Sequence, residues 1–264
     1  MEQFKQFAIN LAKEAGGIMR ANFMLGMKRE WKEDNSPVTE TDLAINQLVI
    51  DSVRNAFPNH SVLAEEGSSI IEGSTYTWVC DPVDGTMPFS HGIPTFVFSL
   101  ALVENGVPIV GVVYDPLLDR LYSAVKGQGA QLNERPIKVS QAMDFQKEIV
   151  VLEWPSFMPD TQFVCKMWQE IVLRKGKIIR LGSAVYSGAL VACGEFLGVL
   201  FGAPTAHDAA ALKILVEEAG GKVTDIDGNE QRYDRPINGA IISNGHVHDQ
   251  LLELVRKSRL PTQT

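Results

Sequence analysis

The sequence predicts a mixed fold in two halves, an α+β half followed by an α/β half. Apolar residues at helical spacing open the chain, apolar runs joined by a hairpin signal follow, and short apolar runs then alternate with helical segments. Runs joined by tight turns are typical of antiparallel sheets, and strands that alternate with helices are typical of α/β units. We expect the halves to be residues 1–143 and 144–264, with the junction inside residues 141–146.

Two helices are predicted near the N-terminus. Phe4, Phe7 and Leu11 recur at helical spacing, which predicts an amphipathic helix over residues 2–24. A second helix is predicted over residues 41–56, because its apolar residues also lie on one face. Residues 39–42 have the pattern of a capping box for this helix, with an aspartate in the acidic position.

The rest of the first half is predicted to be mainly β. An apolar run at residues 61–64 predicts a strand that ends just before two glutamates. Long strands are predicted at residues 95–103 and 108–114, joined by a hairpin turn. Shorter strands are predicted near residues 121–125 and 137–139, with glycine and asparagine as turn signals between them.

The second half is predicted to alternate strands with helices. Strands are expected near residues 149–152, 178–180, 197–201 and 240–243, and helices near residues 157–173, 183–193, 208–219 and 246–257. The last helix begins with His246 and His248, which are two residues apart and not at a helical ligand spacing. We expect both histidines to lie on the surface.

Composition is that of a globular enzyme. The 264 residues are 45% hydrophobic and 21% charged, which excludes a disordered chain and suffices for a large core. The net charge of −8 argues against a broad nucleic-acid-binding surface. The three cysteines lie far apart without a Cys-x-x-Cys pair, which favours a reducing cytoplasm. Neither a signal peptide nor a membrane span is predicted.

The segment Asp-Pro-Val-Asp-Gly-Thr at residues 81–86 is the most informative part of the chain, because it follows an apolar strand. Mg²⁺ prefers hard oxygen ligands, which Asp81 and Asp84 supply. Gly85 lets the backbone approach a ligand closely. Thr86 precedes a predicted helix start, whose free N–H groups attract phosphate. The segment therefore predicts a divalent-metal phosphate site.

Two further acidic residues would complete such a site. Glu65 follows the strand predicted at residues 61–64, so its carboxylate should lie at a strand end. Asp208 lies in the first turn of the helix predicted at residues 208–219, where it is a good cap and also a possible ligand.

Several pieces of the chain, in the family's order along the sequence, resemble the inositol monophosphatase family of metal-dependent, lithium-sensitive phosphatases. Residues 78–89 are close to the family's first signature, apolar-Asp-Pro-Ile/Val-Asp-Gly-Thr. Residues 207–211 are close to the second, Trp-Asp-x-Ala-Ala/Gly, with His207 in place of the tryptophan. Further matching pieces lie at residues 36–42, 65–66 and 180–184, so the resemblance covers nearly the whole sequence. It implies a layered α-β-α-β-α sandwich with the metal site between the halves.

The resemblance also implies two to three Mg²⁺ ions. One would be held by Glu65, Asp81 and the carbonyl oxygen of Val83. A second would be held by Asp81, Asp84 and Asp208, and a weaker third ion would also contact Glu65.

Catalytic roles follow from the same resemblance. Glu65 and Thr86 would orient and deprotonate the attacking water, and the Thr86 hydroxyl would be tied to Asp42. The substrate would contact Asp84, Gly85, Thr86, Gly182, Ser183 and Ala184. Inositol-specific members carry a glutamate seven residues before the aspartate of the second signature, where this chain has Phe201.

Several residues keep a structural alternative. Asp42 and Ser183 could each be only a helix N-cap. Lys32 precedes a loop in which some relatives carry a functional lysine, but it could equally be a solvated surface residue. His91 could line the cleft, and His207 could contact substrate or simply pack.

We expect a Mg²⁺-dependent phosphomonoesterase for a small phosphorylated metabolite, with inositol monophosphate as the default. Fructose 1,6-bisphosphate, histidinol phosphate and 3′-phosphoadenosine 5′-phosphate are alternatives, since Phe201 offers no hydroxyl acceptor. A hypothesis from another class is a non-catalytic regulatory or binding protein on the same fold. The resemblance further implies a lithium-sensitive homodimer, and we expect no nucleic-acid or membrane partner.

Overall fold

The amphipathic N-terminal segment forms a helix that lies on a sheet in the computed structural model, which describes residues 1–24, 26–33, 36–153 and 161–259. Helix α1 (Glu2–Asn22) buries its apolar face, including Leu11, Ala15 and Met19. Helix α2 (Glu40–Ala56) follows the predicted capping box, in which the backbone N–H of Thr39 donates to the Asp42 carboxylate at 3.0 Å. Both predicted N-terminal helices are therefore present.

The first large sheet has seven strands in the order β3-β4-β5-β6-β7-β8-β9. Strands β3 and β4 are parallel, and every other neighbouring pair in this sheet is antiparallel. The strands are β3 (Ser61–Ala64), β4 (Tyr76–Asp84), β5 (Val97–Glu104), β6 (Val107–Asp115), β7 (Arg120–Val125), β8 (Ala130–Leu132) and β9 (Arg135–Pro136). A small sheet pairs β1 (Glu30–Trp31) with β2 (Pro37–Val38), and helix α3 (Thr86–Ser90) follows β4.

The second large sheet has five strands in the order β11-β10-β12-β14-β13, with β10 parallel to both β11 and β12. The strands are β10 (Ile149–Leu152), β11 (Lys177–Ile179), β12 (Gly198–Phe201), β13 (Lys222–Thr224) and β14 (Ala240–Ser243). The helical elements of this half are α4 (Thr161–Leu173), α5 (Ala184–Ala192), the 3₁₀ turn η1 (Ala206–Asp208), α6 (Ala210–Glu218) and α7 (His248–Arg259).

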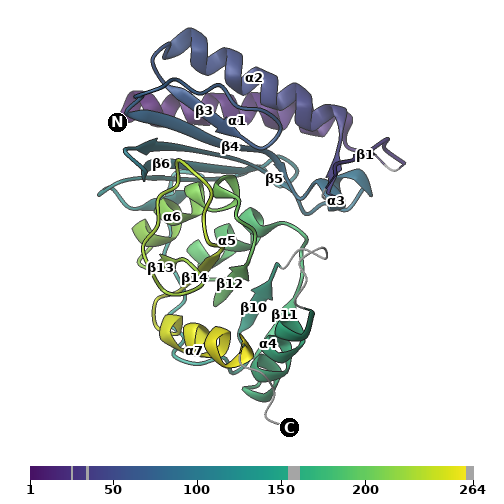
Figure 1. The fold of residues 1–264 in the computed structure, drawn as a ribbon, viewed down its shortest axis with the longest axis vertical. Coiled ribbons are helices and arrows are strands. Elements are labelled where there is room, and N and C mark those ends of the chain that lie inside the picture. Colours follow the sequence, from purple (N-terminus) through teal and green to yellow (C-terminus); the bar gives the residue numbers. More distant parts are fainter. Residues whose placement is uncertain (25, 34–35, 154–160, 260–264) are drawn as a thin grey trace.

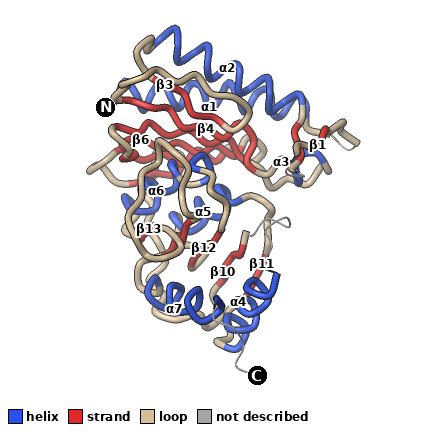
Figure 2. The backbone as a smooth tube through the Cα atoms, in the orientation of Figure 1, coloured by secondary structure: helices blue, strands red, loops and turns tan. Residues whose placement is uncertain are grey.

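The elements stack in alternating layers. Figure 1 shows α1 and α2 on the outer face of the seven-stranded sheet, α5 and α6 between the two sheets, and α4 and α7 beyond the five-stranded sheet. The same order of helix and strand layers is visible along the backbone in Figure 2. This arrangement is the predicted α-β-α-β-α sandwich, and the fold-class prediction is confirmed.

Residues 141–146, which lie in the chain between the last strand of the first large sheet and the first strand of the second, form no helix or strand. One apolar core nevertheless joins both halves, since Val79 and Tyr122 belong to the same buried cluster as Val151 and Leu212. The division at residues 143 and 144 stays a prediction.

Several local predictions were wrong. No strand forms over residues 137–139, because pairing at the sheet edge ends with β9. The helix predicted from residue 208 begins at Ala210, after the separate turn η1. The helix predicted from residue 157 begins within the described residues at Thr161, and residues 157–160 lie outside them. Among the described helices, none combines the length and apolarity needed to cross a membrane.

The prediction for the last histidines was half right. His246 is exposed, but His248 is fully buried. The His248 ring lies 2.9 Å from Thr224 Oγ1 through Nε2 and 2.9 Å from Ser243 Oγ through Nδ1. Partners on β13 and β14 therefore satisfy both ring nitrogens in the interior.

Candidate active site

A tight turn at the end of β4 positions the predicted metal-binding aspartates. The pairing of β4 with β5 is irregular between Asp81 and Asp84, and the strand ends there. Gly85 follows with a φ of 94°, and a Cβ atom at this position would lie 2.6 Å from the carbonyl oxygen of Thr95. Only glycine fits this left-handed, crowded position without strain. Helix α3 then begins at Thr86 itself, whereas the helix start was predicted just after this residue.

Two groups of potential ligand atoms share Asp81. Within the described residues, one oxygen each from Asp81, Asp84 and Asp208 lie within 4.8 Å of one another. The same limit holds for one ligand atom each from Glu65, Asp81 and His207. The structure thus brings together residues that follow β3, end β4 and form η1. All four carboxylates predicted to bind metal belong to these groups.

Burial and mutual repulsion make the carboxylates of Asp81 and Asp84 costly to ionise in the absence of a cation. Burial, followed by the charges of Glu65, Asp84 and Asp208, raises the pKa of Asp81 well above its ordinary value. Burial and then Asp208 likewise raise the pKa of Asp84. A divalent cation would offset this repulsion, and oxygen ligands are those that Mg²⁺ prefers. The residues present therefore fit a divalent metal.

Val83 lies within the turn and is fully buried. Its backbone N–H donates to Asp81 Oδ1 at 3.0 Å, and its carbonyl oxygen lies 3.0 Å from Thr86 Oγ1. The N–H of Val83 thus contacts Asp81 and its carbonyl contacts Thr86, and the role of the carbonyl as a metal ligand stays a prediction.

Asp42 is both a helix cap and a neighbour of Thr86. Its carboxylate accepts from the backbone N–H and the hydroxyl of Thr39, and Thr86 Oγ1 donates to Asp42 Oδ1 at 2.9 Å. Burial raises the pKa of Asp42, although the donors from Thr39 and Thr86 act in the opposite direction. The hydrogen bond expected between Thr86 and Asp42 is present.

The start of α5 surrounds the carboxylate of Asp84. The backbone N–H groups of Ala184, Val185 and Tyr186 donate to it at 3.1, 3.0 and 3.3 Å. The Ser183 hydroxyl also donates to Asp84, and Ser183 Oγ accepts from the N–H of Tyr186 as the N-cap of α5. Ser183 is therefore a helix cap that also contacts a predicted metal ligand.

Lys32 is not a freely solvated surface residue. Its ammonium group lies 2.8 Å from Glu65 Oε1 and 2.5 Å from Glu66 Oε1. Burial lowers the pKa of Lys32, but the two glutamates raise it overall above its ordinary value. Lys32 thus places a positive charge beside a predicted metal ligand.

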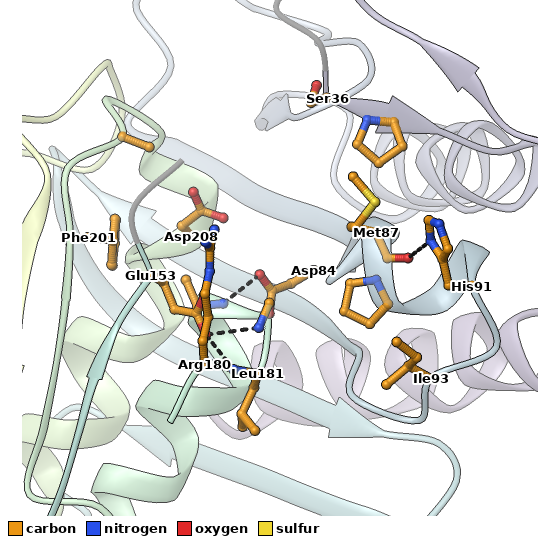
Figure 3. Close-up of a pocket in the computed structure, with 15 residues that line it drawn as sticks. Ser36, Asp84, Met87, His91, Ile93, Glu153, Arg180, Leu181, Phe201 and Asp208 are labelled. Atoms are coloured by element: carbon orange, nitrogen blue, oxygen red, sulfur yellow. Dashed lines mark hydrogen bonds and ion pairs between the residues drawn. The ribbon is translucent and has the colours of Figure 1, made fainter. Parts of the chain in front are cut away.

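A cavity of about 840 Å³ opens beside the carboxylates. Figure 3 shows Asp84 and Asp208 on its wall, with Met87, His91 and Ile93 on one side and Phe201 on the other. Gly182 and Ala184 also line it, and their contact with substrate stays a prediction. Phe201 is only 1% exposed, so it presents little more than an edge to the cavity.

Glu153 and Arg180 line the cavity. Glu153 was not singled out from the sequence, and Arg180 was noted only as part of the segment 180–184 that resembles the family. The Glu153 carboxylate accepts the backbone N–H groups of Leu181 and Gly182, each at 3.0 Å, and lies 3.4 Å from Arg180 Nε. Glu153 directly follows β10, so the signal that identified Glu65, an acidic residue at the end of an apolar run, was present here too.

Comparisons with known proteins agree with this site and fold. The model of the family described as "Inositol monophosphatase family" matches residues 1–260. The chain is 35% identical to "Inositol monophosphatase 2" of Solanum lycopersicum, over 98% of this chain and 100% of the relative. It is 34% identical to the "Fructose-1,6-bisphosphatase/inositol-1-monophosphatase" of Thermotoga maritima, over 95% of each. A solved IMPase structure from Thermotoga maritima superimposes with a TM-score of 0.87 at 32% identity, over 98% of each chain.

Fold, carboxylate cluster and relatives together define a metal-dependent phosphatase. The chain belongs to the inositol monophosphatase family. It is accordingly a phosphoric monoester hydrolase, which confirms the predictions of family and enzyme class.

Proposed function

We propose that this protein is a Mg²⁺-dependent phosphomonoesterase with inositol monophosphate as its default substrate. The observation that carries the proposal is the gathering of the Asp81, Asp84 and Asp208 carboxylates, of which Asp84 and Asp208 line a cavity. Buried carboxylates in mutual contact favour a divalent cation, and phosphate chemistry is catalysed chiefly by positioning and charge neutralisation.

The proposed ligand sets are those implied by the family resemblance. Glu65, Asp81 and the carbonyl oxygen of Val83 would hold one ion, and Asp81, Asp84 and Asp208 would hold a second. A weaker third ion would contact Glu65. Bound Mg²⁺ supplies positive charge to the phosphoryl oxygens and lowers the pKa of a water molecule.

Thr86, Asp42 and Glu65 would handle the attacking water. Because the Thr86 hydroxyl donates its hydrogen to Asp42 at 2.9 Å, the lone pairs of its oxygen are left to accept from water. Thr86 would thereby orient the water, and Glu65 would take its proton as the new P–O bond forms. The P–O bond to the leaving oxygen breaks in the same displacement, and the departing alkoxide takes a proton from a water molecule and leaves as the alcohol.

The proposed substrate contacts lie around the start of α5. Gly85 and Thr86 would meet the phosphate through backbone N–H groups, while Asp84, Ser183 and Ala184 would meet the alcohol portion. Gly182 would allow close approach, because it has no side chain at the cavity wall, and its φ of 73° favours glycine at this position. Phe201 would select the alcohol portion of the substrate by its shape rather than by hydrogen bonds.

A sugar bisphosphate is the second candidate substrate. The relative from Thermotoga maritima carries both fructose-1,6-bisphosphatase and inositol-1-monophosphatase in its name. In this chain Arg180 adds a permanent positive charge to the described cavity wall. A guanidinium group is suited to a second phosphate.

Phosphate release from a substrate panel tests the proposal. Inositol 1-phosphate, fructose 1,6-bisphosphate, histidinol phosphate and 3′-phosphoadenosine 5′-phosphate would each be assayed with Mg²⁺ and with EDTA. We expect turnover of at least inositol 1-phosphate or fructose 1,6-bisphosphate with Mg²⁺ and none with EDTA. Equal turnover in EDTA would contradict the role of the metal.

A cytoplasmic, lithium-inhibited homodimer completes the proposal. Family resemblance supports dimerisation and lithium inhibition, and the unpaired cysteines support a reducing compartment. Sedimentation analysis of the purified protein should give twice the mass of one chain, and millimolar Li⁺ should reduce Mg²⁺-dependent turnover.

A further inference from the structure

His207 is the residue at which this chain departs from the second family signature, where tryptophan is usual. It is partly buried and lies in η1, directly before Asp208. A ring nitrogen of His207 and one carboxylate oxygen each of Glu65 and Asp81 lie within 4.8 Å of one another. The side chain thus lies at the carboxylates rather than in the surrounding apolar core.

The 3₁₀ turn explains how neighbouring residues serve different groups. A 3₁₀ helix has about three residues per turn, so consecutive side chains point roughly 120° apart. Asp208 therefore joins Asp81 and Asp84, whereas His207 joins Glu65 and Asp81. Asp81 belongs to both groups of potential ligands. The group with Asp84 and Asp208 offers only oxygen atoms, and the group with Glu65 and His207 offers oxygen and nitrogen atoms.

This difference has a consequence for metal choice. Carboxylate oxygen suits Mg²⁺, whereas imidazole nitrogen suits ions such as Fe²⁺, Co²⁺ and Zn²⁺. Affinity for nitrogen ligands also rises along the first transition row. A tryptophan, the residue usual at this position in the family, could not supply a metal ligand.

We propose that His207 is a nitrogen ligand of the ion held by Glu65 and Asp81, and that it makes this position selective for a divalent transition-metal ion over Mg²⁺. The group formed by Asp81, Asp84 and Asp208 keeps its preference for Mg²⁺. The inference rests on the proposed function, because the same carboxylates would serve the phosphatase reaction.

Spectroscopy of the Co²⁺-loaded protein tests the ligand directly. A histidine bound to paramagnetic Co²⁺ gives an exchangeable imidazole N–H proton resonance far outside the normal NMR range. We expect such a resonance in the wild type and its loss in His207→Gln. The matched control is His91→Gln, because His91 lines the same cavity but belongs to neither ligand group. This control should keep the resonance.

Calorimetric titration of the metal-free protein gives the second readout. His207→Gln should raise the dissociation constant for Co²⁺ at least ~10-fold, while the dissociation constant for Mg²⁺ should change by less than about 3-fold. His207→Trp, which restores the usual family residue, should behave like His207→Gln. Circular dichroism would confirm that all variants are folded.

Two results would overturn the inference. One is a wild-type protein that binds Co²⁺ without a shifted imidazole resonance. The other is a folded His207→Gln protein with unchanged affinity for Co²⁺. Neither readout depends on turnover. The phosphatase proposal would fail separately, if a protein that binds its metals released no phosphate.

Discussion

Thr86 Oγ1 donates a hydrogen bond to Asp42 Oδ1 across 2.9 Å and joins the turn after β4 to the first turn of α2. The two residues are 44 positions apart in the chain. Asp42 is buried and also accepts from Thr39, so its carboxylate is held in one orientation. The hydroxyl of Thr86 is thereby fixed beside the proposed metal ligands.

Replacing Thr86 by valine should reduce turnover without removing the metal. Valine has nearly the same shape but no hydroxyl, so water would lose its proposed acceptor while the carboxylate ligands remain. We expect kcat to fall by ~10²-fold or more. Calorimetry should show Mg²⁺ affinity within about 3-fold of the wild type.

Thr86→Ser is the control, because serine keeps the hydroxyl and should retain most of the activity. If Thr86→Val turned over as fast as Thr86→Ser, the hydroxyl would have no part in the reaction.

Tyr186 should stabilise the metal site indirectly, through its contact with Asp84. Its backbone N–H donates to Asp84, and its hydroxyl donates to Asp115 Oδ2 at 2.9 Å while accepting from Arg120 at 3.2 Å. Removing the hydroxyl with Tyr186→Phe would leave Asp115 short of a donor and loosen the start of α5. We expect Mg²⁺ affinity to fall by ~3- to 10-fold, measured by calorimetry.

Tyr122→Phe is the matched control. Tyr122 is fully buried and belongs to the same core cluster as Tyr186, but its hydroxyl has no hydrogen-bond partner among the described residues. Its removal should leave Mg²⁺ affinity unchanged. Equal losses in the two variants would show a general packing effect rather than support of Asp84.

Stability should fall in mild acid because of His248. Burial, and then the charge of Lys222, lowers the pKa of His248 from 6.5 to about 4. Between these values the unfolded chain binds a proton that the folded protein does not, so the free energy of unfolding decreases as pH falls from 6.5 towards 4. The loss should reach at most about 3 kcal/mol.

Urea unfolding at several pH values, with saturating Mg²⁺, would measure this loss. In His248→Asn the slope in this pH range should flatten, whereas His246→Gln, at an exposed histidine, should keep the wild-type slope. An unchanged slope in His248→Asn would assign the pH dependence to other groups.

Arg180 should affect substrates that carry a second phosphate. Its guanidinium is about half exposed at the cavity and lies 3.4 Å from Glu153. We expect Arg180→Gln to raise the KM for fructose 1,6-bisphosphate by ~3- to 10-fold, since a partly exposed charged contact is modest. The KM for inositol 1-phosphate should stay unchanged.

Arg174→Gln removes an arginine that pairs with Glu170 and does not line the described cavity. It should alter neither KM. If Arg180→Gln raised the KM for both substrates equally, Arg180 would contact the phosphate that is hydrolysed rather than the second phosphate.

The carboxylate cluster could be predicted because its signals are local. Asp81 and Asp84 lie at the end of one strand within a recognisable sequence pattern, and Glu65 follows another strand. The capping box at Thr39 and Asp42 is likewise a pattern within one helix turn. Such patterns depend only on residues that are close in the sequence, so they can be recognised without knowledge of the fold.

Other features depend on contacts between distant segments. The burial of His248 requires Thr224 and Ser243, and the pairing of Lys32 with Glu65 requires the small β1-β2 sheet to lie near β3. The short strands β8 and β13 have too few residues for a periodic pattern. None of these could be predicted from local sequence.

The central claim is that the cluster of Asp81, Asp84 and Asp208 binds the metal on which phosphate release depends. The most direct test is phosphate release against Mg²⁺ concentration for the wild type and for folded Asp84→Asn. Saturable, Mg²⁺-dependent turnover in the wild type and a loss of ~100-fold or more in the variant would agree with the account. Asp84→Asn turnover equal to that of the wild type at every Mg²⁺ concentration would contradict it.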